Sequence, residues 1–483
     1  MSFAPVVLLW VMLAATAAAL VAVRRLRFLA AVAVAVPLFA LPLWYLARPP
    51  ASGAPVGLLG WQMAAGEPAW QLSGVVIWLL LAAVARMMLD RDLVHQPNRS
   101  VAAAFALAAA ALPALYAADG QTQVAAVALF AAVWSLGDRG ASAGRWLWLA
   151  AAVFLLWAGA VGGSTFALLA AALLLGLWPL DGWRGSEASP GLSVMRLGLP
   201  VVIGAAVLSA TAGGGLAGAW LAAATALGLL SLLIGLARLR ERSTAGLARP
   251  LAGALAGLAL VAAAWAGETA LLAAARLAVF APAALLLVPR PAGQSATGSG
   301  RAGGLLPSIV VYAALAGLPL TVGFAVLARL YAAWPLPGGL VLIVATAALL
   351  SLWLAALYLS AALSGTGSGR VAWLNALPAL LTVIGLIAFD TTALDSPPLV
   401  WAAVLVPAVA GGLLGRFVPG LRALPGLLRE ALAPGLPLER LAPARRVGAI
   451  LSSAIADAAA LLEGANGLLF LLALIVLLVW IGL

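Results

Sequence analysis

The chain has no cysteine and no lysine, and only one histidine, among its 483 residues. Without cysteine there are no disulfides, no thiol chemistry, no iron–sulfur clusters and no Cys-ligated zinc. The histidine, His95, lies in the arginine-bearing stretch "DRDLVHQPNRS", where a solvated side chain is expected. The sequence also has no phosphate-binding glycine loop and no acidic cluster with metal-ligand spacing. We therefore predict no cofactor, no metal site and no catalytic residue.

Charged residues are scarce as well, at 8% of the chain, whereas soluble domains carry roughly a quarter. Hydrophobic residues make up 65%, and the mean hydropathy is +1.15. The chain divides into about sixteen apolar segments, each long enough to cross a bilayer as a helix. A membrane-spanning backbone must satisfy its own hydrogen bonds, and these Ala- and Leu-rich runs do not alternate as barrel strands do. The sequence predicts an all-α polytopic membrane protein with about 14–16 transmembrane helices.

The arginines follow the odd-numbered segments. We place the spans near 3–23, 28–47, 72–89, 101–118, 121–136, 146–161, 164–180, 193–212, 216–237, 248–266, 268–288, 306–330, 338–362, 371–389, 398–415 and 466–483. After the even spans only Arg48 is found, together with Glu67, Asp119, Glu268, Asp390 and Asp395. The positive-inside rule then puts the odd-numbered ends in the cytoplasm and both termini outside. We expect a bacterial inner membrane, and we interpret the net charge of +11 as a topology signal rather than nucleic-acid binding.

Two stretches interrupt the pattern of apolar helices. Between spans seven and eight runs "GLWPLDGWRGSEASPGLSVMRLGLP", which contains Pro179, Trp183 and Pro190. Span twelve contains "LAGLPLTVGFAVLARLY", in which Pro319 lies between Gly317 and Gly323. Proline removes a backbone hydrogen bond, and a broken helix is tolerated in a membrane only where protein or water satisfies the backbone again. We predict helix breaks in spans eight and twelve.

In this order and separation, the two stretches resemble signatures of the antiporter-like membrane subunits of respiratory complex I, membrane hydrogenases and Mrp-type cation antiporters. The Pro-x-His-x-Trp loop of that family has its counterpart in Pro179, Asp181 and Trp183, followed by Ala188, Ser189 and Pro190. Its Gly-Ile-Pro-Pro-x-x-Gly-Phe segment has its counterpart in Gly317, Leu318, Pro319, Leu320, Gly323 and Phe324. Neither signature is intact.

The resemblance implies a domain organisation. Residues 1–100 are N-terminal helices, and 101–363 form an antiporter-like core of two inverted five-helix repeats, 101–212 and 216–363. Residues 364–418 are C-terminal helices, and 464–483 form the last transmembrane helix. Apolar and charged residues at helical spacing within 419–463 favour an amphipathic interfacial helix, with an ordinary cytoplasmic loop as the alternative.

In that family, protons or cations are thought to move along buried Glu, Lys and His residues. A desolvated lysine can exchange its proton near neutral pH, whereas arginine stays protonated. The corresponding positions of this chain carry Ser135, Leu174, Val201, Ala248, Ala281 and Leu327. None of these side chains can relay a proton.

Few ionisable residues remain within or near the spans. We single out Arg276, Arg329, Glu268 and Asp390 as a candidate polar axis. The arginines either line this axis or pair with carboxylates of a neighbouring subunit. Alternatively, they snorkel or donate to carbonyls at the helix breaks, because a charge in mid-bilayer needs a partner or water.

These observations predict a degenerate antiporter-like subunit that lacks its own proton relay. Its role would be structural or coupling, within a complex I-like, energy-coupled membrane complex such as an ion-translocating oxidoreductase. The expected partners are other membrane subunits and the lipid bilayer. The alternative is a stand-alone secondary transporter of a small solute that uses the broken helices as its site, with Arg276 holding an anion. A membrane enzyme acting on lipid or glycan is less favoured, because the outer loops are short.

Overall fold

The computed structural model describes residues 4–22, 35–38, 40–41, 44, 55–58, 60–89, 97–136, 143–162, 164–177, 190–212, 218–237, 244–287, 302–333, 370–387 and 395–405. The predicted segments 419–463 and 464–483 lie outside the described residues, as does Asp390. The predicted division into repeats 101–212 and 216–363 stays a prediction.

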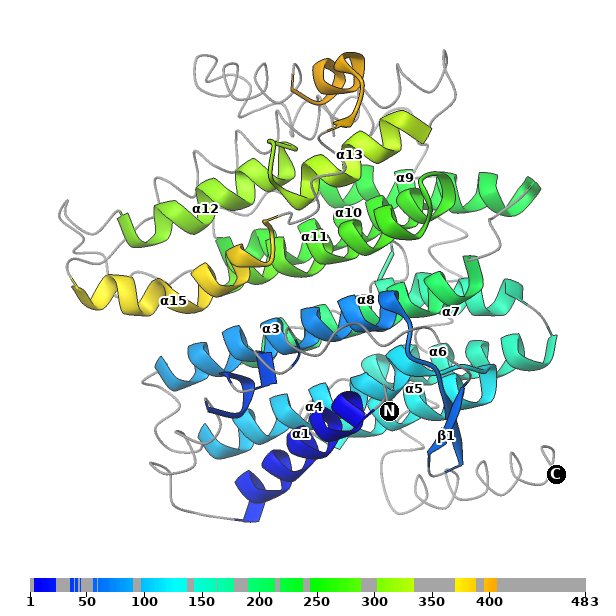
Figure 1. Ribbon diagram of the computed structural model, residues 1–483, viewed down its shortest axis with the longest axis vertical. Coiled ribbons are helices and arrows are strands. Elements are labelled where there is room, and N and C mark those ends of the chain that lie inside the picture. The colour runs from blue at the N-terminus through cyan, green and yellow to red at the C-terminus, as the bar shows by residue number, and fades with distance from the viewer. Residues whose placement is uncertain are drawn as a thin grey trace.

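The described part of the chain is built of apolar helices that lie side by side with roughly parallel axes (Figure 1). Their bounds are α1 Ala4–Ala22, α3 Glu67–Leu89, α4 Pro97–Tyr116, α5 Gly120–Leu136, α6 Ala143–Gly162, α7 Ser164–Leu175, α8 Pro190–Ala212, α9 Gly218–Ala237, α10 Thr244–Trp265, α11 Gly267–Leu287, α12 Ala302–Leu315, α13 Val322–Ala333 and α15 Arg370–Ile384. Among the described helices, four are long and apolar enough to cross a membrane: α3, α8, α10 and α11. The predicted all-α polytopic fold is confirmed.

Small residues let these helices approach closely, as the pair α9 and α10 illustrates. A Cβ at Gly235 would lie only 2.6 Å from the backbone nitrogen of Ala254. Ser231 Oγ donates to the carbonyl of Gly253 at 3.0 Å, and Trp265 Nε1 donates to Thr225 Oγ1 at 2.8 Å. Close backbone approach and interhelical hydrogen bonds drive helix association in lipid, where the hydrophobic effect contributes little.

A small β-hairpin that the sequence did not predict precedes α3. Strands β1 (Val56–Leu58) and β2 (Trp61–Met63) pair antiparallel around Gly60, whose φ is +84°. The hairpin extends to the α4–α5 turn, where Ala64 N donates to Tyr116 O and Ala118 N to Gln62 O, both at 2.8 Å. The segments before α3 and after α4 therefore meet on one side of the helices. Both follow even-numbered spans, so this agrees with the predicted alternation.

The interruption predicted in span twelve is present, between α12 and α13. Gly317 has a φ of +70°, and Leu318 N donates to Ala313 O at 2.9 Å, which is the geometry of a glycine-capped helix end. Pro319 follows this cap. Helix α13 starts so close to the end of α12 that a Cβ at Gly323 would overlap the carbonyl oxygen of Ala314.

The break predicted in span eight is wrong. Helix α8 is continuous, and Pro190 is its first residue, where the missing N–H costs nothing. Pro200 lies inside α8 without ending it. The preceding helix, α7, ends after 12 residues at Leu175, and the next residue, Gly176, has a φ of +67°. This end packs beside the middle third of α8, where a Cβ at Gly204 would lie 3.0 Å from Leu175 N.

Candidate functional site

The strongest polar constellation on the predicted axis surrounds Arg276, near the middle of the 21-residue helix α11. Its Nη2 donates to the carbonyl oxygen of Gly385 at 3.1 Å and to that of Ile387 at 3.2 Å. Both carbonyls belong to the turn that follows α15. Helices α11, α12, α13 and α15 lie together in the upper half of the molecule (Figure 1). Of the alternatives left open by the sequence, these two hydrogen bonds match donation to carbonyls at the end of a helix.

The same turn is bonded to the start of α13. Val322 N donates to Leu386 O at 2.9 Å, and Thr321 forms an antiparallel β-bridge with Ile387. Thr321 is also the N-cap of α13, because its Oγ1 accepts from Phe324 N at 3.3 Å. The carbonyls of Gly385, Leu386 and Ile387 thus all have donors, two from Arg276 and one from Val322.

Tight packing fixes the position of this turn against α11. Gly385 lies on the ring of Phe280, one turn along α11 from Arg276, and a Cβ at Gly385 would be 2.5 Å from Cδ2 of that ring. In α13, Phe324 packs against Trp401 with ring centroids 4.6 Å apart. We call the region where α11, the start of α13 and the turn after α15 meet the junction.

A second arginine, Arg196 on α8, was not among the predicted site residues. It is only 3% exposed, and its guanidinium lies over the Trp134 ring of α5, 5.5 Å from the centroid. Trp134 in turn meets Phe130 edge-on. Pro200 lies four residues after Arg196 and cannot donate to its carbonyl. An arginine one and a half turns into an apolar helix, followed by a proline, is the signal that would have singled it out.

Five of the positions that the resemblance matched to the family's relay residues are packed as apolar core. Leu174 is 1% exposed, Val201, Ala248 and Ala281 are 0% exposed, and Leu327 is 8% exposed. Ser135, near the end of α5, donates its hydroxyl to the carbonyl of Ala132 in its own helix. Among the described residues, the buried polar side chains are Thr16, Ser73, Thr122, Arg196, Ser231, Thr321 and Thr382, so none of them is a carboxylate or a histidine.

The other predicted residues that the structure describes lie on α8, α11 and α13 or at the α12–α13 interruption. Glu268 lies in the first turn of α11, where its carboxylate accepts a hydrogen bond from Ser209 Oγ near the end of α8. Arg329 is a partly buried residue of α13. Gly317, Pro319 and Gly323 lie at the α12–α13 interruption. In the ranges that the structure describes, no group of His, Asp and Glu could hold a metal ion.

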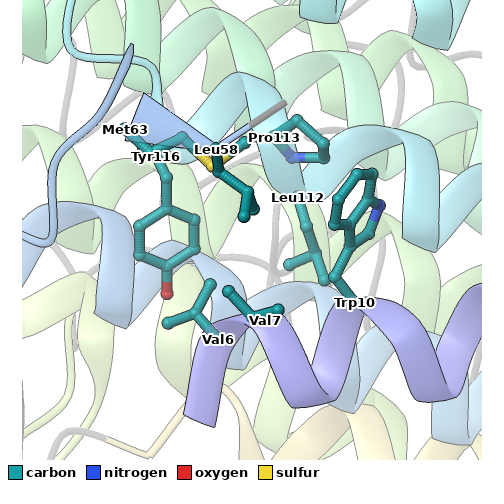
Figure 2. Close-up of a pocket in the computed structure, with 8 residues that line it drawn as sticks. All are labelled: Val6, Val7, Trp10, Leu58, Met63, Leu112, Pro113 and Tyr116. Atoms are coloured by element: carbon teal, nitrogen blue, oxygen red, sulfur yellow. The ribbon is translucent and has the colours of Figure 1, made fainter. Parts of the chain in front are cut away.

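A partly open apolar pocket lies between α1, the hairpin and the end of α4 (Figure 2). Its lining is Val6, Val7, Trp10, Leu58, Met63, Leu112, Pro113 and Tyr116. The Tyr116 hydroxyl donates to Ser73 Oγ at 3.0 Å, so it is engaged within the helix bundle. Trp44 Nε1 donates to the same oxygen at 3.1 Å. An apolar lining of this kind supports packing rather than acid–base chemistry.

No protein-family model matches the sequence, and no curated protein matches it. Solved structures do match its fold over almost the whole chain. One is a chain of the membrane-bound sulfane sulfur reductase (MBS), an archaeal respiratory membrane complex, with a TM-score of 0.70 and 16% identity over 98% of this chain and 99% of that chain. Another is a chain of the Mrp complex from Dietzia sp. DQ12-45-1b, with a TM-score of 0.67 and 14% identity over 99% of this chain and 62% of that chain.

These likenesses confirm the predicted antiporter-like fold. At 14–16% identity it is the fold that is shared. The chemistry of this chain has to be argued from its own side chains.

Proposed function

We propose that this chain is a membrane subunit of a multi-subunit complex of the complex I or Mrp kind, with a structural or coupling role and no side-chain proton relay of its own. The observation that supports the proposal most directly is the burial of Leu174, Val201, Ala248 and Ala281 in apolar core. These are positions where related subunits are expected to place titrating residues.

A relay needs successive groups that gain and lose protons near neutral pH, within reach of one another or of bridging water. Arginine does not meet this requirement, because its guanidinium stays protonated in proteins. Arg196 and Arg276 therefore act as fixed positive charges within the helix bundle. Fixed positive charge in a low-dielectric interior opposes the entry of protons and other cations. The remaining buried polar side chains among the described residues are hydroxyls.

A flux measurement tests the missing relay. The purified chain is reconstituted in liposomes, and a pH gradient is imposed together with a potassium diffusion potential. We expect proton flux indistinguishable from that of empty liposomes, while an added proton ionophore gives the full signal in both. Flux well above the empty control that is abolished by Arg276→Ala or Arg329→Ala would show that the chain conducts through its own residues.

The role as a subunit is tested by purification in mild detergent from the native membrane. Co-purification with other membrane subunits at fixed stoichiometry is expected. A monodisperse single chain would favour the alternative, a stand-alone secondary transporter of a small solute. For that alternative, binding of a small anion should be lost in Arg276→Gln.

A further inference from the structure

Helix α15 ends in a turn of Gly385, Leu386 and Ile387, which contacts α11 and the start of α13. Helix α15 ends with i to i−3 bonds, from Gly385 N, Leu386 N and Ile387 N to the carbonyls of Thr382, Val383 and Ile384. The carbonyls of Gly385, Leu386 and Ile387 lie past Ile384, the last residue of α15. In a membrane such groups must find donors from the protein or from water. Here Val322 N supplies one donor, and Arg276 supplies the donors for Gly385 and Ile387.

We propose that Arg276 is a fixed cationic clamp, which holds the end of α15 against the start of α13 in one closed arrangement. A single nitrogen, Nη2, reaches two carbonyls that are two residues apart, so the guanidinium spans the turn. Its charge also faces the C-terminal end of α15, where the helix dipole favours a cation. The glycine at 385 lets this turn approach α11 closely enough for both bonds.

The choice of arginine has a consequence for movement at the junction. A lysine or a carboxylate at this place could change its charge with pH and release the turn. Arginine keeps its charge, so protonation cannot open this contact. The inference rests on the proposed function in this sense: a subunit without a relay has no need for a junction that switches. The clamp itself is a statement about backbone contacts, and it can be tested without measuring transport.

The absence of native cysteine makes the junction accessible to disulfide trapping. The described residues include two isolated antiparallel β-bridges, Thr321 with Ile387 at the junction and Met63 with Ala117 at the hairpin. Directly opposed residues of such pairs have Cα atoms within about 4.5–5.5 Å, which a disulfide can span. The pair Thr321→Cys with Ile387→Cys reports on the junction. The pair Met63→Cys with Ala117→Cys is the matched control on another part of the bundle.

Each pair is introduced into the otherwise unchanged chain and into Arg276→Gln and Arg276→Lys backgrounds, and disulfide formation is followed under mild oxidation in membranes. We expect Arg276→Gln to slow the junction disulfide roughly tenfold, since hydrogen bonds to a charged donor are the stronger kind. We expect a smaller slowing in Arg276→Lys, and an unchanged rate for the control pair in both backgrounds.

The clamp would be overturned if the junction disulfide formed at the same rate in the parent and in Arg276→Gln, with the rate of the control disulfide unchanged. If Arg276→Gln loses both disulfides, the bundle has misfolded, and the decision passes to Arg276→Lys. If Arg276→Lys slows formation of the junction disulfide but not of the control disulfide, the clamp is supported. If it changes neither rate, the clamp is refuted. If Arg276→Lys also loses both disulfides, the clamp is refuted, because the role of Arg276 would then extend to the whole bundle. Proton flux by the parent chain would contradict the proposed function, but it would not change what the disulfide rates say about the clamp.

Discussion

Replacing Gly323 with alanine should separate the two halves of the interrupted helix. The added Cβ would overlap the carbonyl oxygen of Ala314 at the end of α12. The clash is with backbone, so no side-chain rotation relieves it. Helix α13 would have to shift, and with it Val322 N, which donates to Leu386 O at 2.9 Å.

The size of the effect follows from two opposing terms. Alanine favours a helix over glycine by up to about 1 kcal/mol. Overpacking typically costs about 1–3 kcal/mol, and a contact with backbone lies toward the upper end of that range. We expect a net loss of about 2 kcal/mol, which corresponds to a fall in melting temperature of roughly 2 °C, since the unfolding entropy of a chain of this size is about 1 kcal/mol/K.

Thermal unfolding in detergent, followed by the fluorescence of the 18 tryptophans, measures this shift. The control is Gly57→Ala in the hairpin, where the nearest neighbour of an added Cβ is Gln62 Nε2 at 3.8 Å. The control should melt like the parent. If Gly323→Ala melts within 1 °C of the parent, roughly the resolution expected of such a scan, the close crossing of α12 and α13 is wrong.

Three further outcomes are expected. Gly385→Ala should lower the melting temperature, because the Cβ would press on the Phe280 ring, and Phe280→Leu in the same chain should recover part of the loss. Thr321→Val should cost about 1 kcal/mol through loss of the α13 N-cap, measured by the same melt, and a stability equal to the parent would count against that cap. Ser100→Cys, in the first turn of α4, should stay unlabelled when intact cells are treated from outside with a membrane-impermeant thiol reagent, because the predicted topology places this end of α4 in the cytoplasm; labelling would contradict the predicted orientation.

The fold was predictable because the signals that set it are local and repeated. Long Ala- and Leu-rich runs leave only helices for a chain in a bilayer. The sequence Gly317-Leu-Pro319 marks a real interruption, because the glycine takes a positive φ and the proline follows the cap. The same logic was misapplied at Pro190. A proline at the first position of a helix begins it, and Pro190 is the first residue of the continuous helix α8.

The site was predictable only in part. Arg276 was singled out by its place in the middle of an apolar span, but its acceptors lie 109 and 111 residues further along the chain. No local pattern connects them, since the turn after α15 carries only apolar side chains. Arg196 was missed because its partner, Trp134, lies on another helix and carries no charge. The hairpin was missed because strands of three residues carry too little pattern to predict.

The interruptions of this bundle are held by groups that do not titrate near neutral pH. Gly176 and Gly317 end their helices through backbone hydrogen bonds, Thr321 caps α13 with its hydroxyl, and Arg276 binds carbonyls with a permanent charge. None of these contacts depends on a lysine or a buried carboxylate. The antiporter-like fold therefore does not depend on relay residues at these places. This is compatible with the proposed absence of a relay, because the contacts that hold the backbone are made by other residues.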